Sequence, residues 1–185
     1  MKPSVFIFHG TGGHPGENWI PWLKGKLEAR DLRVFVPAFP NPNTPHPEAW
    51  YPVMESLLAE ADDRSMVVGH SLGGVIALRF LERLPTPVKR TIIVAMPLGI
   101  PPIKYIEGDS PFFQGGFDWD TVKRNAGRCT VFHSDNDPFV CIENGEECAR
   151  RLGVELTAVP QAGHFNTAAG YTTFPLLLER IALEI

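Results

Sequence analysis

A serine, an aspartate and a histidine that could cooperate in nucleophilic catalysis occur in this order along the chain. The first lies in Gly69-His70-Ser71-Leu72-Gly73, which has the pattern Gly-x-Ser-x-Gly. A short apolar run before it, 66–68, predicts a buried strand, and the apolar spacing of 75–81 predicts a helix. In a strand–turn–helix context this pattern places the serine on a strained turn, with its hydroxyl raised above the sheet. Ser71 is therefore predicted to be a nucleophile.

Two glycines of this motif have a predicted steric role. A Cβ atom at Gly69 or Gly73 would collide where the strand and the helix approach each other. The helix would begin directly beneath the Ser71 hydroxyl, so that its unpaired N–H groups and positive dipole end face a developing negative charge. A chance serine in a glycine-rich turn is the structural alternative, which the agreement of motif and context disfavours.

A serine hydroxyl needs a base to accept its proton, and a carboxylate usually orients that base. Asp137 and His164 each follow a predicted strand, and the carboxyl ends of parallel strands meet at one edge of a sheet. Asp135, in the same loop as Asp137, is expected to bond its own backbone as a turn residue. The predicted catalytic set is Ser71, Asp137 and His164. For His164, the structural alternative is an exposed loop histidine.

The oxyanion of an acyl-transfer intermediate needs fixed hydrogen-bond donors. We expect one from the backbone N–H of Leu72 and the other from the N–H of Thr11 or Gly12, in the loop after the first strand. This glycine-rich loop does not fit a dinucleotide site, because Pro15 occupies the position of the third glycine.

Three other histidines are expected to take no part in catalysis. His9 should support the oxyanion loop, His70 should turn away from the nucleophile, and His133 should pack within its strand. No spacing of His, Asp or Cys indicates a metal site, so neither a metal nor a cofactor is expected.

Composition restricts the class of protein. The chain has 185 residues, 44% of them hydrophobic, and a formal net charge of -4, which fits one domain over 1–185 and disfavours nucleic acid or an anionic membrane as a partner. No apolar run approaches the ~20 residues of a membrane span, and no leader pattern precedes the first strand. The three cysteines, Cys129, Cys141 and Cys148, are expected to be free thiols. These features favour a cytoplasmic location.

The predicted elements alternate along the chain. Strands are expected at 5–8, 33–36, 65–69, 91–95, 128–134 and 155–159. Helices are expected at 19–30, 48–61, 72–84, 117–125, 142–152 and 174–183, with an irregular stretch at 96–116. This alternation predicts a six-stranded, open parallel sheet with helices on both faces.

Several motifs together resemble the small α/β-hydrolases of the retinoblastoma-binding serine hydrolase family and its bacterial esterase relatives. The resemblance rests on five segments: His9-Gly10 with Trp19 and Trp22-Leu23, 69–74, 117–119, 135–140 and 163–165. It implies an α/β-hydrolase fold without a cap domain, the triad Ser71, Asp137 and His164, no cofactor, and esterase-type activity. Cys141 departs from the pattern, because relatives often carry proline there.

The expected function is that of a serine hydrolase, a carboxylesterase acting on short-chain acyl esters as small-molecule substrates. The alternatives are a thioesterase, amidase or aminopeptidase with the same triad, or a binding module that does not turn over its ligand. A shallow cleft is expected to bind the substrate between six apolar side chains: Trp19, Met96, Phe112, Phe113, Trp119 and Phe165.

Overall fold

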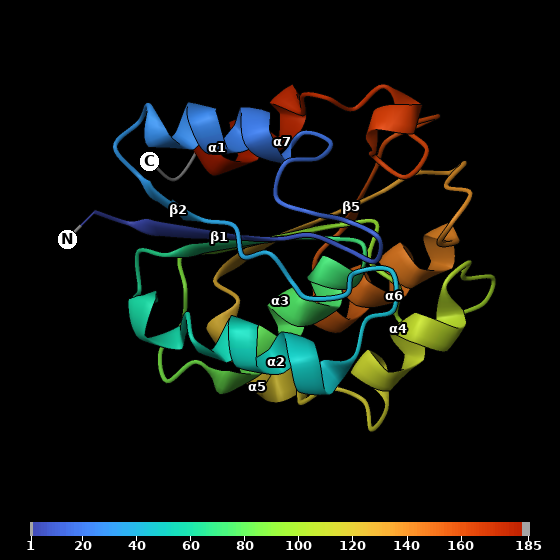
Figure 1. Ribbon diagram of the computed structural model, residues 1–185, viewed down its shortest axis with the longest axis horizontal. Helices are drawn as coiled ribbons and strands as arrows, with labels where there is room; N and C mark the ends of the chain where they lie inside the picture. Colours follow the sequence, from blue (N-terminus) through green and yellow to red (C-terminus); the bar gives the residue numbers. More distant parts are fainter. Residues whose placement is uncertain (1, 183–185) are drawn as a thin grey trace.

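A computed structural model describes residues 2–182, which form a six-stranded parallel sheet (Figure 1). Its strands are β1 (Ser4–Phe8), β2 (Arg33–Phe35), β3 (Met66–His70), β4 (Arg90–Val94), β5 (Arg128–His133) and β6 (Leu156–Ala158). They are arranged in the order β2-β1-β3-β4-β5-β6, and every neighbouring pair is parallel. The predicted strand number and direction are confirmed. All six carboxyl ends therefore lie along one edge.

Helices cover both faces of the sheet, as predicted. On one face lie α1 (Ile20–Glu28) and α7 (Pro175–Ala182); on the other lie α2 (Pro47–Glu55), α3 (Leu72–Arg83), α5 (Trp119–Asn125) and α6 (Ile142–Leu152) (Figure 1). Two 3-10 turns, Leu58–Glu60 and Thr167–Ala169, complete the connections. The last residue of the helix predicted at 174–183 lies outside the described residues.

The two faces carry separate apolar cores, and β1 shows how one strand serves both. Its side chains alternate: Val5 and Ile7 pack with Trp19 and α7, whereas Phe6 and Phe8 pack with α2 and α3. All five residues of β1 are buried. Burial on both faces explains why the strands appear in the sequence as continuous apolar runs.

Two predicted segments differ from the structure. The helix expected at 48–61 ends at Glu55, where the Ser56 hydroxyl donates to the carbonyl of Val53 at 2.7 Å and thus competes with helix continuation. The stretch 96–116, expected to be irregular, contains the helix α4 (Ile106–Phe113). Its glycine and proline content conceals this helix, which buries Asp109 and Phe112 against the rest of the protein.

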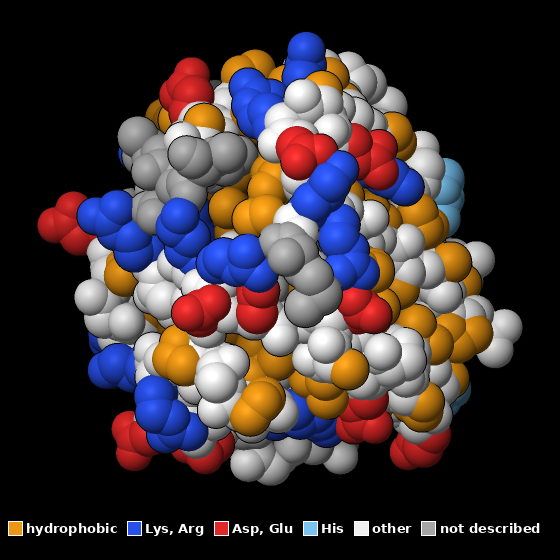
Figure 2. Space-filling view, turned by 90° about the vertical axis from the view of Figure 1, so that its left-hand side faces the viewer, with side chains coloured by type: hydrophobic (Ala, Val, Ile, Leu, Met, Phe, Trp, Pro, Cys, Tyr) orange, Lys and Arg blue, Asp and Glu red, His pale blue; other side chains and the backbone are white. Residues whose placement is uncertain are grey.

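Basic side chains gather at the edge where the strands begin (Figure 2). A hollow there is lined by Arg90, Arg128 and Arg180 among others. This edge is opposite the carboxyl ends of the strands. No helix within residues 2–182 combines the length and the apolar character that crossing a membrane would require.

The approach of α3 to the sheet leaves no room for a side chain at two glycines. A Cβ on Gly73 would lie 2.0 Å from the carbonyl oxygen of Phe8, and one on Gly69 would lie 2.4 Å from that of Gly73. By contrast, a Cβ on Gly25, inside α1, would meet no atom within 4 Å. The predicted steric role of the first two glycines is confirmed.

Substituting these glycines should therefore have opposite effects on stability. Gly73→Ala should lower the free energy of unfolding by at least about 2 kcal/mol, because backbone atoms cannot move aside cheaply. Gly25→Ala should raise it by up to about 1 kcal/mol, because the unfolded chain loses conformational freedom. Urea unfolding measures both values, and similar effects of the two substitutions would contradict this packing.

Asp109 is a buried acid that connects α4 to the loop after β1. Its residue is only 2% exposed, and its Oδ1 accepts a 2.5 Å hydrogen bond from the Thr11 hydroxyl. Burial raises the pKa of Asp109 to about 6, with the Thr11 bond and His164 acting in the opposite direction. The folded protein therefore holds this proton more tightly than the unfolded chain does.

Asp109 should consequently make the stability depend on pH. Because the pKa of Asp109 is higher in the folded state, the contribution of Asp109 to the free energy of unfolding falls as the pH rises from about 4 to about 6. It stays low above that range. Asp109→Asn keeps the acceptor for Thr11 without the charge. The free energy of unfolding of the variant should therefore rise relative to that of the wild type through this pH range, by at most about 3 kcal/mol. Urea unfolding at several pH values measures the difference. The exposed Asp63→Asn is the control, and a pH-independent difference for Asp109→Asn would refute the assignment.

Candidate active site

Ser71 lies on the sharp turn between β3 and α3. Its φ of 54° and ψ of −129° place a non-glycine residue in a rarely populated region, as the sequence predicted. Two backbone bonds hold the turn: Ser71 N–H donates to Val94 at 2.9 Å, and Gly74 N–H donates to the Ser71 carbonyl at 2.8 Å. Gly10 packs so closely that a Cβ there would lie 2.7 Å from the Ser71 Cβ. The strain at Ser71 is thus maintained by contacts on several sides.

Asp137 and His164, from the loops after β5 and β6, are in direct contact. His164 Nδ1 lies 2.7 Å from Asp137 Oδ2, and the aspartate side chain is fully buried. The other oxygen, Oδ1, accepts the N–H groups of Phe139 and Val140 at 2.8 and 3.1 Å. These bonds fix the carboxylate, and Nε2 is the imidazole nitrogen that remains for another partner.

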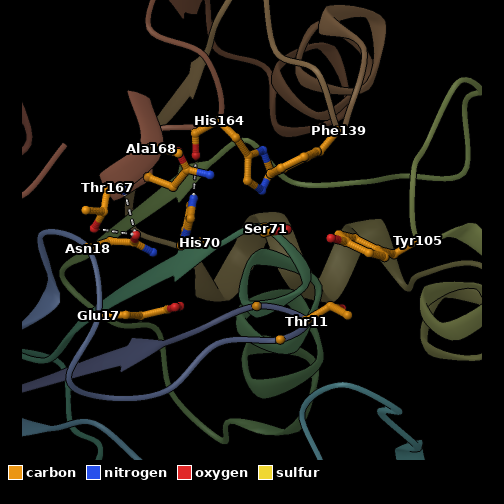
Figure 3. Close-up of a pocket in the computed structure, with 13 residues that line it drawn as sticks. Thr11, Glu17, Asn18, His70, Ser71, Tyr105, Phe139, His164, Thr167 and Ala168 are labelled. Atoms are coloured by element: carbon orange, nitrogen blue, oxygen red, sulfur yellow. Dashed lines mark hydrogen bonds between the residues drawn. The ribbon is translucent and has the colours of Figure 1, made fainter. Parts of the chain in front are cut away.

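Ser71 and His164 line one cleft at the carboxyl edge of the sheet (Figure 3). In Figure 3 the imidazole of His164 lies over the Ser71 side chain. Within residues 2–182, the Ser71 hydroxyl makes no hydrogen bond, so it is available to a group that enters the cleft. The structure thus brings together the three side chains that the sequence singled out.

The loop that carries Asp137 is bonded to the loop that carries His164. Asp135 Oδ1 accepts the N–H of Gln161 at 2.8 Å, which corrects the expectation that this acid would bond its own backbone. Asn136 Oδ1 accepts the N–H of Gly163 at the same distance. These bonds between the two loops fix the position of Asp137 relative to His164.

His70 was expected to turn away from the nucleophile, but it lines the cleft. Its Nε2 lies 2.8 Å from the carbonyl oxygen of His164. Burial lowers the pKa of His70 to about 3, with the neighbouring His164 acting in the same direction. The neutral ring therefore donates from Nε2 and supports the backbone that carries His164. Its place between the motif glycine and Ser71 was the signal available in the sequence.

His9 and His133 are structural, as expected. His9 Nδ1 lies 3.0 Å from the Gly10 carbonyl, while its Nε2 accepts the Phe39 N–H at 3.2 Å. His133 Nε2 lies 2.9 Å from the carbonyl of Val140, in the loop that also carries Asp137. Burial lowers the pKa of both imidazoles, so each is a neutral ring with a defined donor.

The structure distinguishes between the two loop residues that could donate to an oxyanion. Gly12 N–H donates to the carbonyl of Pro42 at 2.8 Å, so it is already engaged. Among the described residues, no acceptor is paired with the Thr11 N–H, and Thr11 lines the cleft. Leu72 begins α3, where the first N–H groups have no acceptor within the helix. The available pair is therefore Leu72 and Thr11.

The cleft has a volume of about 160 Å³ and is mostly polar where it faces solvent. Its described lining is Gly10, Thr11, Gly12, Glu17, Asn18, His70, Ser71, Tyr105, Phe139, His164, Asn166, Thr167 and Ala168. The Phe139 ring packs edge-on against His164, with 4.8 Å between the ring centroids. Glu17 and Asn18 lie in the loop before α1, to which the sequence analysis gave no chemical role.

None of the six apolar side chains expected to wall this cleft is part of its described lining. Four are buried: Trp19, Met96, Phe112 and Phe165. The other two, Phe113 and Trp119, line a separate hollow near α6. The physical reason for this correction is that large apolar side chains are removed from water by the cores on both faces of the sheet.

Trp19 and Phe165 nevertheless affect the site from within the core. Trp19 Nε1 donates to the carbonyl of Phe165 at 3.0 Å, and the Phe165 ring stacks on Phe174 with 5.3 Å between centroids. Both interactions fix the backbone immediately after His164.

Two curated proteins align with nearly the whole chain. The protein YdeN of Bacillus subtilis is 27% identical over 179 residues, which cover 97% of this chain and 94% of that protein. The serine hydrolase RBBP9 of Rattus norvegicus is 28% identical over 169 residues, covering 89% and 87%. A pimeloyl-[acyl-carrier protein] methyl ester esterase of Aromatoleum aromaticum is 34% identical over 101 residues, covering 50% and 37%.

Solved structures support the same relationship. The crystal structure of the ydeN gene product from B. subtilis superposes with a TM-score of 0.92 at 26% identity, covering 99% of this chain and 98% of that one. The architecture is the predicted α/β-hydrolase fold. The family model described as "Serine hydrolase" matches residues 5–182. The chain therefore belongs to the serine hydrolase family.

Proposed function

We propose that this serine hydrolase is a carboxylesterase that cleaves short-chain acyl esters with Ser71, His164 and Asp137 as its triad. The observation that carries the proposal is the 2.7 Å contact between the buried Asp137 side chain and His164, which lines one cleft together with the strained Ser71. This order along the chain and this strand–turn–helix context are typical of α/β-hydrolases.

The reaction has two halves. Ser71 Oγ attacks the ester carbonyl carbon while His164 Nε2 accepts the hydroxyl proton, and Asp137 orients the imidazole and stabilises its charged form. The N–H groups of Leu72 and Thr11 stabilise the oxyanion. The ester C–O bond then breaks, and the alcohol leaves with the proton from His164. Water attacks the acyl-serine with His164 as base, which releases the carboxylic acid and restores Ser71.

Two observations favour short esters. The cleft volume of about 160 Å³ fits a small acyl or alcohol group better than a long chain. The Aromatoleum aromaticum relative, similar to half of this chain, is named as a methyl ester esterase. Rates on matched ester, thioester and anilide substrates would rank ester cleavage against the thioesterase and amidase alternatives.

The cysteines support a location for this activity. Cys129, Cys141 and Cys148 are free thiols. Free thiols persist in a reducing compartment. We accordingly propose that the enzyme acts in the cytoplasm.

A fluorophosphonate probe tests the assigned nucleophile. The wild type should be labelled on Ser71, whereas Ser71→Ala should lose the label and at least about 10³-fold in kcat/KM for p-nitrophenyl acetate. Ser56→Ala, at an exposed serine after α2, should keep both. Peptide mass spectrometry locates the label. A folded wild-type protein that does not react, or that reacts at another residue, would refute the proposed mechanism.

The Thr11 side chain tests the second oxyanion donor. Because the Thr11 hydroxyl donates to Asp109, Thr11→Val should release the loop and misplace its N–H. We expect kcat to fall by about 10-fold or more with little change in KM, since the lost interaction is made mainly in the transition state. Thr11→Ser keeps the hydroxyl and should retain most of the activity. Equal kcat values for the Val and Ser variants would exclude this anchoring role.

A further inference from the structure

Glu17 brings a carboxylate to the cleft that contains Ser71 and His164. It belongs to the loop between β1 and α1, and the mechanism above does not use it. In Figure 3 its carboxylate points toward the side of the cleft where Thr11 and Ser71 lie. A group bound at Ser71 would therefore have this acid as a neighbour.

No lysine or arginine is part of the described lining of the cleft beside Glu17. Among the thirteen described residues that line it, Glu17 is the one carboxylate, and none is Lys or Arg. Within residues 2–182, no Lys or Arg forms an ion pair with Glu17. His70 is neutral because burial lowers its pKa to about 3. The basic side chains shown in Figure 2 gather at the opposite edge of the sheet.

The carboxylate of Glu17 is also partly buried and packs against the loop backbone. A Cβ on Gly13 would come within 2.3 Å of its Oε1. Burial raises the pKa of Glu17, while His14 and His164 act in the opposite direction. A partly desolvated carboxylate attracts a nearby cation more strongly than one in bulk water.

The other side of the cleft has aromatic rings with a positive charge beside them. Tyr105 and Phe139 line it, and the Lys104 ammonium lies over their rings, 5.3 and 4.4 Å from the centroids. These aromatic faces already hold a cation, which would repel a second one. A positive group of a ligand is thus directed to the Glu17 side.

We propose that Glu17 makes the cleft selective for esters that carry a cationic group, a protonated or quaternary amine, near the reacting carbonyl. This inference rests on the proposed esterase function and specifies its substrate class. Glu17 would act as a specificity-determining residue: its carboxylate pairs with the substrate cation and takes no part in the proton transfers.

Isosteric substrate pairs test the inference. Acetylcholine and its neutral carbon isostere, dimethylbutyl acetate, place the charge in the alcohol. The p-nitrophenyl esters of trimethylammoniobutanoate and dimethylhexanoate place it in the acyl group. The measured quantity is the ratio of kcat/KM for the cationic and the neutral member, each corrected for its rate with hydroxide. For at least one pair the wild type should prefer the cationic member by about 3- to 10-fold.

Three variants test whether Glu17 causes a preference for the cationic substrate. Glu17→Gln should bring the ratio to about 1, and Glu17→Lys should bring it below 1. Glu28→Gln removes an equivalent charge at an exposed site on α1 and should retain the wild-type ratio. Comparing ratios within each variant separates substrate choice from any general loss of active protein.

The outcomes also separate this inference from the proposed function. A wild type that is labelled on Ser71 and cleaves neutral esters, but has ratios at or below 1 for both pairs, overturns the inference and leaves the esterase assignment intact. A preference that survives in Glu17→Gln overturns it as well. If the wild type is neither labelled nor able to cleave any of these esters, both the inference on Glu17 and the proposed esterase function are contradicted.

Discussion

The rest of the site depends on the close approach of α3 to the sheet at the turn that carries Ser71. Gly69, Gly73 and Gly10 are three positions around this turn at which backbone or side-chain atoms leave no room for a Cβ. These contacts surround Ser71, whose φ of 54° is rarely populated by a residue other than glycine. The same geometry places the first N–H groups of α3 beside the hydroxyl. One steric constraint thus determines the position of the nucleophile and of one oxyanion donor.

The other loops reach this turn through hydrogen bonds to backbone groups. His70 supports the carbonyl of His164, and Trp19 supports that of Phe165. Asp135 and Asn136 join the acid loop to the histidine loop. The bonds made by His70 and Trp19 are buried, so breaking either would leave an unpaired polar group in a poorly solvated place. The loops are therefore held in one arrangement before a substrate binds.

The sequence predicted the parts of the site that local rules determine. The glycine spacing around Ser71, the apolar run before it and the strand ends before Asp137 and His164 each have a direct physical meaning, and parallel topology places all three at one edge. The order of elements followed from the same patterns. Among the α-helices of residues 2–182, the sequence missed α4, because its glycine and proline content favours irregular structure and its stability comes from tertiary burial.

The walls of the cleft were not predictable in this way. Trp19 and Phe112 are as apolar as a pocket residue would be, yet the cores bury them. The cleft is instead lined by short polar loop segments, such as Glu17 and Asn18, whose meeting with Ser71 depends on how loops distant in sequence pack together. For the same reason, the sequence alone could not distinguish between Thr11 and Gly12 as the oxyanion donor. The structure distinguishes them, because the Gly12 N–H donates to the carbonyl of Pro42.

The central claim is that Ser71 and His164 work as one unit. The most direct test compares kcat/KM of Ser71→Ala, His164→Ala and the double variant on one ester. Residues that act together are strongly non-additive, so the double variant should be about as active as the worse single variant. A double variant whose loss equals the product of the two separate losses would show that the residues act independently, which would contradict this account.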